Sequence, residues 1–172
     1  SDGFPSRELI ARGLEQKLVE LRSAGLVPDA LTYAGNGEPT LHPDFAGVID
    51  DTIRIRDRYA PGTKVVVLSN ASLAHRDGIK DALLRADRNI LKLDTGIQET
   101  FLRLNQPLVN ISLEDIIHNL KLFDKNLIIQ TLFIRGSHKG KVIDNTSGEE
   151  IKALLALYEE IRPAEVQVYT IA

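Results

Sequence analysis

The sequence contains no cysteine. Disulfide bonds, thiolate catalysis and cysteine metal sites are therefore excluded within this chain. Methionine is absent too, even at the first position, which indicates either a piece of a longer protein or modified methionines missing from the printed sequence. No stretch approaches the roughly 20 apolar residues that span a membrane, and no charged and apolar leader opens the chain. We therefore expect a cytoplasmic protein.

Neither sign of charge predominates, since the formal net charge is -3. Without a basic excess, nothing in the composition indicates a nucleic-acid-binding face. The 172 residues are 43% hydrophobic and 26% charged, which is typical of a globular chain. This length suits one domain with a sizeable core, so we expect a single domain over residues 1–172.

Strands and helices alternate along the chain. β-Branched and apolar runs predict five strands, at 30–34, 64–69, 89–94, 127–133 and 165–171. Apolar residues at helical spacing predict helices over 6–24, from 45 to the residue before Pro61, and over 76–86 and 98–104. Two more are predicted to begin at Ser112 and at Ser147, where Glu150 would complete a capping box. A polar loop is predicted at 136–146.

This alternation predicts an α/β fold with about five parallel strands, arranged as a partial (β/α) barrel or an open curved sheet. A doubly wound, Rossmann-like sheet is the main alternative. The chain opens with a helix and closes with a strand, which is what would remain if a first strand were cut away. Such a cut would leave an exposed sheet edge that could pair with a second copy of the chain.

Polar residues follow the predicted strands, at the edge of a parallel sheet where ligands bind. Because the carboxyl ends of parallel strands meet at one edge, we expect these groups to form a binding site. The candidates, in chain order, are Gly35, Asn36, Gly37, Glu38, Ser69, Asn70, Lys92, Asp94, Gln130 and Thr170.

The stretch "GNGEP", residues 35–39, follows the first strand. Its glycines allow positive φ and close backbone approach, so bare carbonyl and amide groups could bind the head group of an amino acid. It matches neither GxGxxG nor GxxxxGK[ST], so nothing supports a dinucleotide or triphosphate site. The simpler interpretation is an Asn-Gly turn in which Pro39 delays the next helix.

Lys92 and Asp94 lie two residues apart on a predicted strand, so they share a face, while Leu91 and Leu93 point the other way. This pair indicates either a polar site inside a barrel or a charge pair near a sheet edge. Gln130 lies within an apolar strand, where its amide needs a partner. It either lines the site or bonds to a neighbouring strand.

The chain has four histidines without metal-ligand spacing, so no metal site is predicted for them: His42, His75, His118 and His138. A basic stretch, "RGSHKGK" at 135–141, lies at the expected active end of the sheet. It would either grip an acidic substrate or remain solvated. The 136–146 loop is expected to help select the substrate.

Four segments together resemble the radical S-adenosylmethionine (SAM) superfamily, in particular its Fe-S oxidoreductases related to activating enzymes. They are "TYAGNGEPTLHPDF", "VVVLSNAS", "NILKLDTG" and "VQVYTIA", in the order and strand positions of that family. "GNGEP" is similar to the family's GGEP motif. The resemblance implies a (β/α)6 TIM-like core, a [4Fe-4S] cluster on a CxxxCxxC loop, and reductive cleavage of SAM to a 5'-deoxyadenosyl radical that abstracts hydrogen from a substrate. It also implies an electron donor such as flavodoxin or ferredoxin.

By position, the resemblance implies a role for each candidate. The segment from Gly35 to Glu38 would receive the methionyl ammonium group. Ser69 and Asn70, with Lys92 and Asp94, would contact the carboxylate and ribose. Gln130 would line the cavity, and residues 168–171, which include Thr170, would pack near adenine.

One departure from the family is decisive: without cysteine this chain cannot bind the [4Fe-4S] cluster. We therefore expect a radical SAM core fragment that lacks its first strand and cluster loop and is inactive alone. The alternative is a non-catalytic α/β ligand-binding or regulatory domain. A third interpretation, a metal-independent barrel enzyme, would use Glu38 and Asp94 as its acid-base pair.

Overall fold

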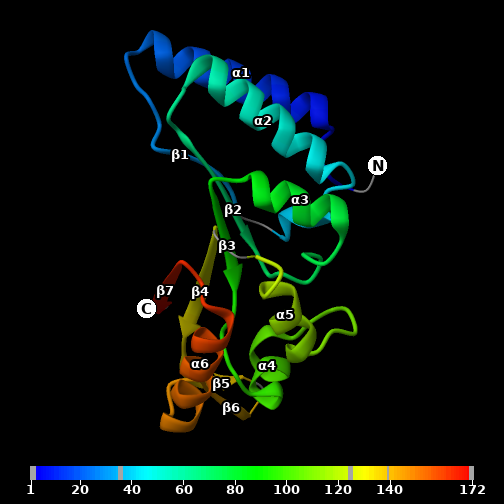
Figure 1. Ribbon diagram of the computed structural model, residues 1–172, viewed down its shortest axis with the longest axis vertical. Coiled ribbons are helices and arrows are strands. Elements are labelled where there is room, and N and C mark those ends of the chain that lie inside the picture. Colours follow the sequence, from blue (N-terminus) through cyan, green and yellow to red (C-terminus); the bar gives the residue numbers. More distant parts are fainter. Residues whose placement is uncertain (1–2, 35–36, 124–125, 139, 171–172) are drawn as a thin grey trace. The chain divides into compact units, whose positions relative to one another are not determined.

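The computed structural model describes residues 3–34, 37–123, 126–138 and 140–170 (Figure 1). The helices are α1 (Arg7–Ser23), the 3-10 helix η1 (Pro39–Leu41), α2 (Phe45–Tyr59), α3 (Asp77–Arg85), α4 (Gln98–Asn105), α5 (Leu113–Leu120) and α6 (Gly148–Ile161). The strands are β1 (Ala30–Tyr33), β2 (Lys64–Ser69), β3 (Arg88–Lys92), β4 (Leu127–Phe133), β5 (Arg135–His138), β6 (Lys141–Asp144) and β7 (Glu165–Thr170).

Five of the strands form one parallel sheet in the order β1-β2-β3-β4-β7. This confirms the predicted α/β class and the five parallel strands. Since β1 and β7 are the two ends of the order, the sheet is not closed into a barrel in the part of the chain that is described. The strand order follows the chain order, as successive βαβ units require.

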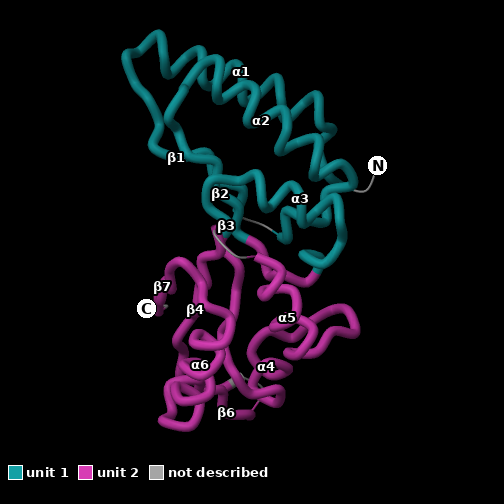
Figure 2. Tube along the Cα trace, in the orientation of Figure 1, with its two compact units in different colours: residues 1–68, 73–89 teal, residues 69–72, 90–172 magenta. Residues whose placement is uncertain are grey.

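The chain divides into two compact units, and Figure 2 colours them separately. Unit 1 comprises residues 1–68 and 73–89, and unit 2 comprises residues 69–72 and 90–172. The single domain expected over 1–172 stays a prediction.

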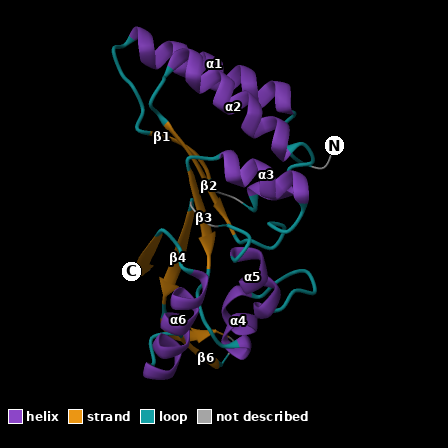
Figure 3. Cartoon of the chain, viewed as in Figure 1, coloured by secondary structure: helices purple, strands orange, loops and turns teal. Residues whose placement is uncertain are grey.

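Unit 1 is built on two long helices that lie side by side, α1 and α2 (Figure 3). Leu18 of α1 and Ile55 of α2 are buried together, and Leu14 and Leu31 pack against them. The apolar face of α1 forms because its leucines recur at helical spacing. Beneath the helices, β1 pairs with β2 in parallel register from Ala30↔Lys64 to Tyr33↔Val67.

Unit 2 contains the sheet positions that hold most of the predicted site. β4 pairs with β7 in parallel register from Ile128↔Glu165 to Phe133↔Thr170. The helix predicted from Ser112 is confirmed, and Ser112 and Asp115 form a reciprocal capping box at its start. The cap reduces the number of unpaired backbone amides at the N-terminus of α5.

The structure corrects two local predictions. Residues 136–146 are not a loop throughout, because β5 and β6 form an antiparallel hairpin with Arg135 opposite Asp144. A solvent-exposed hairpin carries polar side chains, so its composition looked like that of a loop. At the start of α6, the Ser147 side chain accepts a hydrogen bond from the Glu150 amide, as predicted. The Glu150 carboxylate, which a capping box would direct to the Ser147 amide, accepts a hydrogen bond from the Thr95 hydroxyl (2.6 Å).

Candidate functional site

The glycine stretch after β1 is only partly visible. Gly35 and Asn36 lie outside the described residues. Gly37 has a φ of 137°, which L side chains rarely adopt and which explains glycine at that position. Glu38 is the N-cap of η1, and its Oε1 accepts from the Thr40 amide (3.1 Å) and hydroxyl (2.6 Å). The carboxylate therefore stabilises the turn itself.

The two polar residues after β2 also stabilise a turn. Ser69 Oγ accepts from the Ala71 amide (3.1 Å), and Asn70 Oδ1 accepts from the Ser72 amide (2.9 Å). Ala71 has a positive φ of 64°, an unfavourable conformation that these bonds and Asn119 help to hold. Asn119 of α5 donates to the Ala71 carbonyl (2.9 Å). Both predicted residues thus have local structural roles.

Lys92 and Asp94 do share a face, and their charged groups meet. Lys92 Nζ lies 3.2 Å from Asp94 Oδ2, and the side chains are 34% and 1% exposed, respectively. Asp94 Oδ1 accepts from the Leu132 amide (2.8 Å), and Oδ2 accepts from Asn105 Nδ2 (2.8 Å). Asp94 is therefore a buried anchor, whereas the Lys92 ammonium group reaches solvent and can bind an anion.

Neighbouring strands extend the face that carries Lys92. The Leu93 amide donates to the Gln130 carbonyl (3.1 Å), which places Lys92 beside Gln130, and Gln130 lies beside Gln167 of β7. Residues that pair across strands share a face. Lys92, Gln130 and Gln167 thus form one row.

A second row follows along the same face. Leu132 and Tyr169 lie two residues beyond Gln130 and Gln167 in β4 and β7. Asp94 lies two residues beyond Lys92, just after β3 ends, so the predicted strand 89–94 is two residues too long at this end. Tyr169 is 38% exposed. The face therefore offers a cation, two amides and a phenol to a ligand.

The opposite face of the same strands is covered by α6. Thr131 donates to the Leu93 carbonyl (2.6 Å), and its hydroxyl also bonds to the Tyr158 hydroxyl of α6 (2.6 Å). Burial raises the pKa of Tyr158, and the charge of Asp94 raises it further. Tyr158 therefore stays neutral and serves as a hydrogen-bonding group.

Thr170 does not share the Lys92 face. It pairs with Phe133, two residues beyond Thr131, so it lies on the α6 side of the sheet. Its predicted role in binding stays a prediction. The Lys92 face instead receives Gln167 and Tyr169 from β7.

Asn145 stabilises the carboxyl edge of the sheet in unit 2. Its Nδ2 donates to the carbonyls of Asp94 (2.7 Å) and Leu132 (2.6 Å), and its Oδ1 accepts from the Ile134 amide (2.8 Å). Neither Asn145 nor Asn105 was predicted, because a single asparagine after a loop has no distinctive spacing. The hairpin that Asn145 closes carries the basic residues, and Arg135 forms an exposed ion pair with Asp144 (3.4 Å).

The residues present do not fit an iron-sulfur cluster. The chain contains no cysteine, so no thiolate can ligate iron. Within the described residues, no group of three or more His, Asp or Glu side chains could hold a metal ion. The same residues include no helix that is long and apolar enough to cross a membrane.

Comparison with known proteins finds relatives that are longer than this chain. No family model matches. A GTPase Obg of Brachyspira hyodysenteriae is 28% identical over 146 residues, which are 83% of this chain and 20% of that protein. UPF0026 proteins of Helicobacter pylori and Synechocystis are 30% and 28% identical and align with 83% and 81% of this chain. The alignments cover 44% and 49% of those proteins, so the chain spans less than half their length.

Two solved structures align with this chain. The GH53 catalytic domain of Ignisphaera aggregans aligns with a TM-score of 0.50 and 12% identity over 96% of this chain and 54% of that one. A domain of pyruvate-formate lyase-activating enzyme from Bacteroides vulgatus aligns with a TM-score of 0.44 and 16% identity over 83% of this chain and 98% of that one. The first similarity is at the level of the fold alone.

Proposed function

We propose that the chain is the SAM-binding part of a radical SAM Fe-S oxidoreductase. In the whole protein, SAM would be cleaved by one electron, supplied through a cluster held outside this chain, to methionine and a 5'-deoxyadenosyl radical that abstracts hydrogen from a substrate. Four segments that resemble this family support the proposal, as does the similarity to UPF0026 proteins over most of the chain. The electron donor would be a flavodoxin or ferredoxin.

The observation that carries the proposal is the Lys92 face of unit 2. SAM carries a carboxylate, and Lys92 offers a partly exposed ammonium group whose position Asp94 fixes at 3.2 Å. Gln130 and Gln167 lie beside it and can bond to the polar groups of the ligand. A buried carboxylate that already accepts two hydrogen bonds holds the cation in place, so little entropy is lost when the ligand binds.

The cluster belongs, in this proposal, to a part of a longer protein outside the given sequence. The chain supplies no thiolate, and we derive no step through the cluster from its residues. The roles left to this chain are to bind SAM, orient its carboxylate and provide one wall of the cavity. The residues that would carry them are Lys92, Asp94, Gln130 and Gln167.

Calorimetric titration of the chain with SAM tests the binding role. We expect saturable binding that Lys92→Gln weakens by about tenfold, since a charge-assisted hydrogen bond is lost. Lys152→Gln is the matched control, because Lys152 is an exposed lysine on α6 and its loss should leave binding unchanged. No binding, or equal losses in the two variants, would contradict the assignment of Lys92.

A second experiment separates the radical enzyme from a non-catalytic binding domain. Anaerobic reconstitution with iron and sulfide should give this chain no cluster absorbance at about 400 nm. The whole protein, reconstituted and reduced, should produce 5'-deoxyadenosine from SAM. If the chain binds SAM but the whole protein never cleaves it, the binding-domain alternative replaces the enzyme proposal.

A further inference from the structure

Strand β7 leaves one edge of the sheet open in unit 2 (Figure 1). It ends the strand order, so it pairs with β4 on one side and with no strand on the other side among the described residues. Such an edge presents backbone amides and carbonyls to another strand unless proline, lysine or a short length protects it. The sequence "EVQVYT" contains neither proline nor lysine. The edge expected from the sequence adjoins the first strand, but β1 has four residues and β7 has six.

An apolar surface flanks this open edge on the α6 side of the sheet. It has four members, which are between 37% and 60% exposed: Ile151, Leu155, Val166 and Val168. In α6, Ala153 packs against Gly96, which follows β3. Ile151 and Leu155 lie on the opposite flank of the helix, because each residue turns it by about 100°. Since the strand order is β3-β4-β7, that flank lies on the β7 side.

The other face of β7 carries polar side chains. Gln167 and Tyr169 extend the Lys92 face, and Glu165 precedes them at the same two-residue spacing. Gln167 Nε2 donates to Glu165 Oε1 (2.8 Å). A strand added at the open edge must therefore be apolar on the α6 side and polar on the Lys92 side.

A second copy of β7 meets both requirements. In an antiparallel pair with a two-fold axis at Gln167, residues of the same face lie opposite each other. Val166 then lies opposite the partner's Val168, and Gln167 lies opposite the partner's Gln167. Glu165 lies opposite the partner's Tyr169, whose phenol can donate to the carboxylate. Cross-strand pairs of these kinds stabilise a sheet.

We propose that the chain forms a two-fold symmetric dimer through this antiparallel β7 pair. An axis at Val168 is less favourable, because it sets Val166 against the partner's Thr170. The axis at Gln167 also brings the two apolar surfaces together, so Ile151 and Leu155 become covered. The interface uses the same patch on both copies, as two-fold symmetry requires.

The dimer would also extend the Lys92 face. The row of Lys92, Gln130 and Gln167 would continue into the partner's Gln167, which adds an amide at the edge of the proposed SAM site. This consequence rests on the proposed function, whereas the dimer itself does not.

Sedimentation equilibrium of the chain tests the dimer. The mass should rise with concentration toward twice the 19.0 kDa of one chain. Val168→Lys should raise the dissociation constant at least about tenfold, because two buried valines are replaced by charged side chains. Val142→Lys is the matched control, since it makes the same change at an exposed valine of β6, and it should leave the constant unchanged.

Disulfide trapping tests the register, and the lack of native cysteine makes each introduced thiol unique in its chain. Directly opposed residues of an antiparallel pair have Cα atoms about 4.5–5.5 Å apart, which a disulfide can bridge. Gln167→Cys should therefore cross-link two copies under mild oxidation. Glu165→Cys should not, because its two copies would lie four residues apart along the pair, at roughly 14 Å.

Three results would each overturn the proposal. They are a monomer at every concentration, equal dissociation constants for Val168→Lys and Val142→Lys, and cross-linking of Gln167→Cys no faster than that of Glu165→Cys. Circular dichroism of each variant shows whether the fold is kept, and the cysteine variants report the pairing without a charge at the interface. None of these measurements involves SAM, so the dimer and the proposed function can fail separately.

Discussion

Replacing Asp94 with alanine should destabilise unit 2 strongly. The side chain is 1% exposed and accepts from the Leu132 amide and from Asn105 Nδ2, both at 2.8 Å. Removing it leaves both donors buried without a partner. Depriving two such donors of their acceptor costs about 1–3 kcal/mol each. The ion pair with Lys92 adds at most about 1 kcal/mol, because the lysine is partly solvated.

Asp94→Asn should cost much less, about 1–2 kcal/mol. The new amide oxygen can still accept from Leu132, and the new NH2 group would face Asn105. Asn105 Oδ1 is buried and has no partner within the described structure. A flip of the Asn105 amide would therefore give both groups a partner. The loss in free energy of unfolding should be much larger for Asp94→Ala than for Asp94→Asn, and smallest for Lys92→Gln.

Native-state hydrogen exchange at the Leu132 amide is the appropriate assay, because it reports the opening of unit 2 directly. Urea denaturation followed by circular dichroism supplies the global free energy. A loss below about 1 kcal/mol in Asp94→Ala would refute the role of Asp94 as a buried anchor. Equal losses in the two Asp94 variants would show that its charge, and not its hydrogen bonds, dominates.

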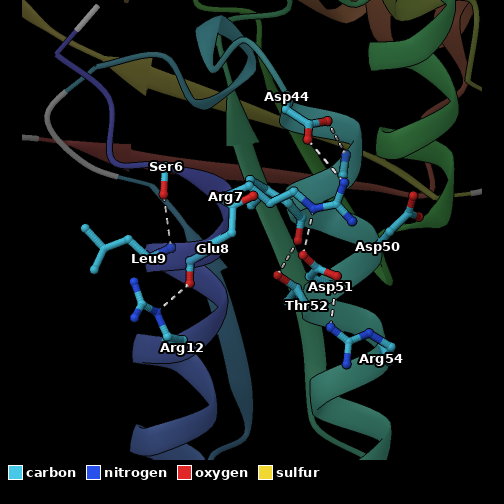
Figure 4. Close-up of polar contacts among 12 residues, drawn as sticks. Ser6, Arg7, Glu8, Leu9, Arg12, Asp44, Asp50, Asp51, Thr52 and Arg54 are labelled. Atoms are coloured by element: carbon cyan, nitrogen blue, oxygen red, sulfur yellow. Dashed lines mark hydrogen bonds and ion pairs between the residues drawn. The ribbon is translucent and has the colours of Figure 1, made fainter. Parts of the chain in front are cut away.

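Three further changes follow from single features of the fold. Gly96→Ala should lower the melting temperature and cost about 1–3 kcal/mol, because its Cβ would lie 2.7 Å from that of Ala153. Asn89→Leu should raise the free energy of unfolding in urea by about 1–3 kcal/mol, since both amide atoms of Asn89 are buried without a described partner; a loss would show that the amide is satisfied. The hydrogen bond from Arg7 lowers the pKa of Asp51 to about 2, so this contribution to stability is present above the unfolded pKa and is lost as pH falls from about 4 to about 2. Acid titration of Arg7→Gln should show a smaller loss, because Arg54 still bonds to Asp51 (Figure 4); the difference is expected to be under about 1 kcal/mol, since the Arg7 side chain is partly solvated.

The strands were the most predictable part of the fold. β2 and β4 begin and end where the sequence predicts, because "KVVVLS" and "LIIQTLF" are apolar, β-branched runs between polar residues. The hairpin of β5 and β6 was missed because strands in solvent need no apolar pattern. Hydrophobic periodicity detects burial and only indirectly detects hydrogen bonding.

The candidate site was predictable only where one strand determines it. Lys92 and Asp94 share a face because they are two residues apart, and this needs no knowledge of the neighbouring strands. The contribution of β7 depends on its register with β4, which a sequence does not reveal. This is why Thr170 was chosen there in place of Gln167 and Tyr169. Asn105 and Asn145 were missed because their partners lie 11 and more residues away.

Asn145 allows the rest of the β5–β6 hairpin to vary in sequence. Its side chain closes the base of the β5–β6 hairpin with bonds that do not involve the hairpin's own side chains. Length and sequence beyond that base can therefore change without loss of the closure. For protein engineering, the end of the hairpin away from that base is the place to graft a recognition loop, and Asn145 is the residue to leave untouched.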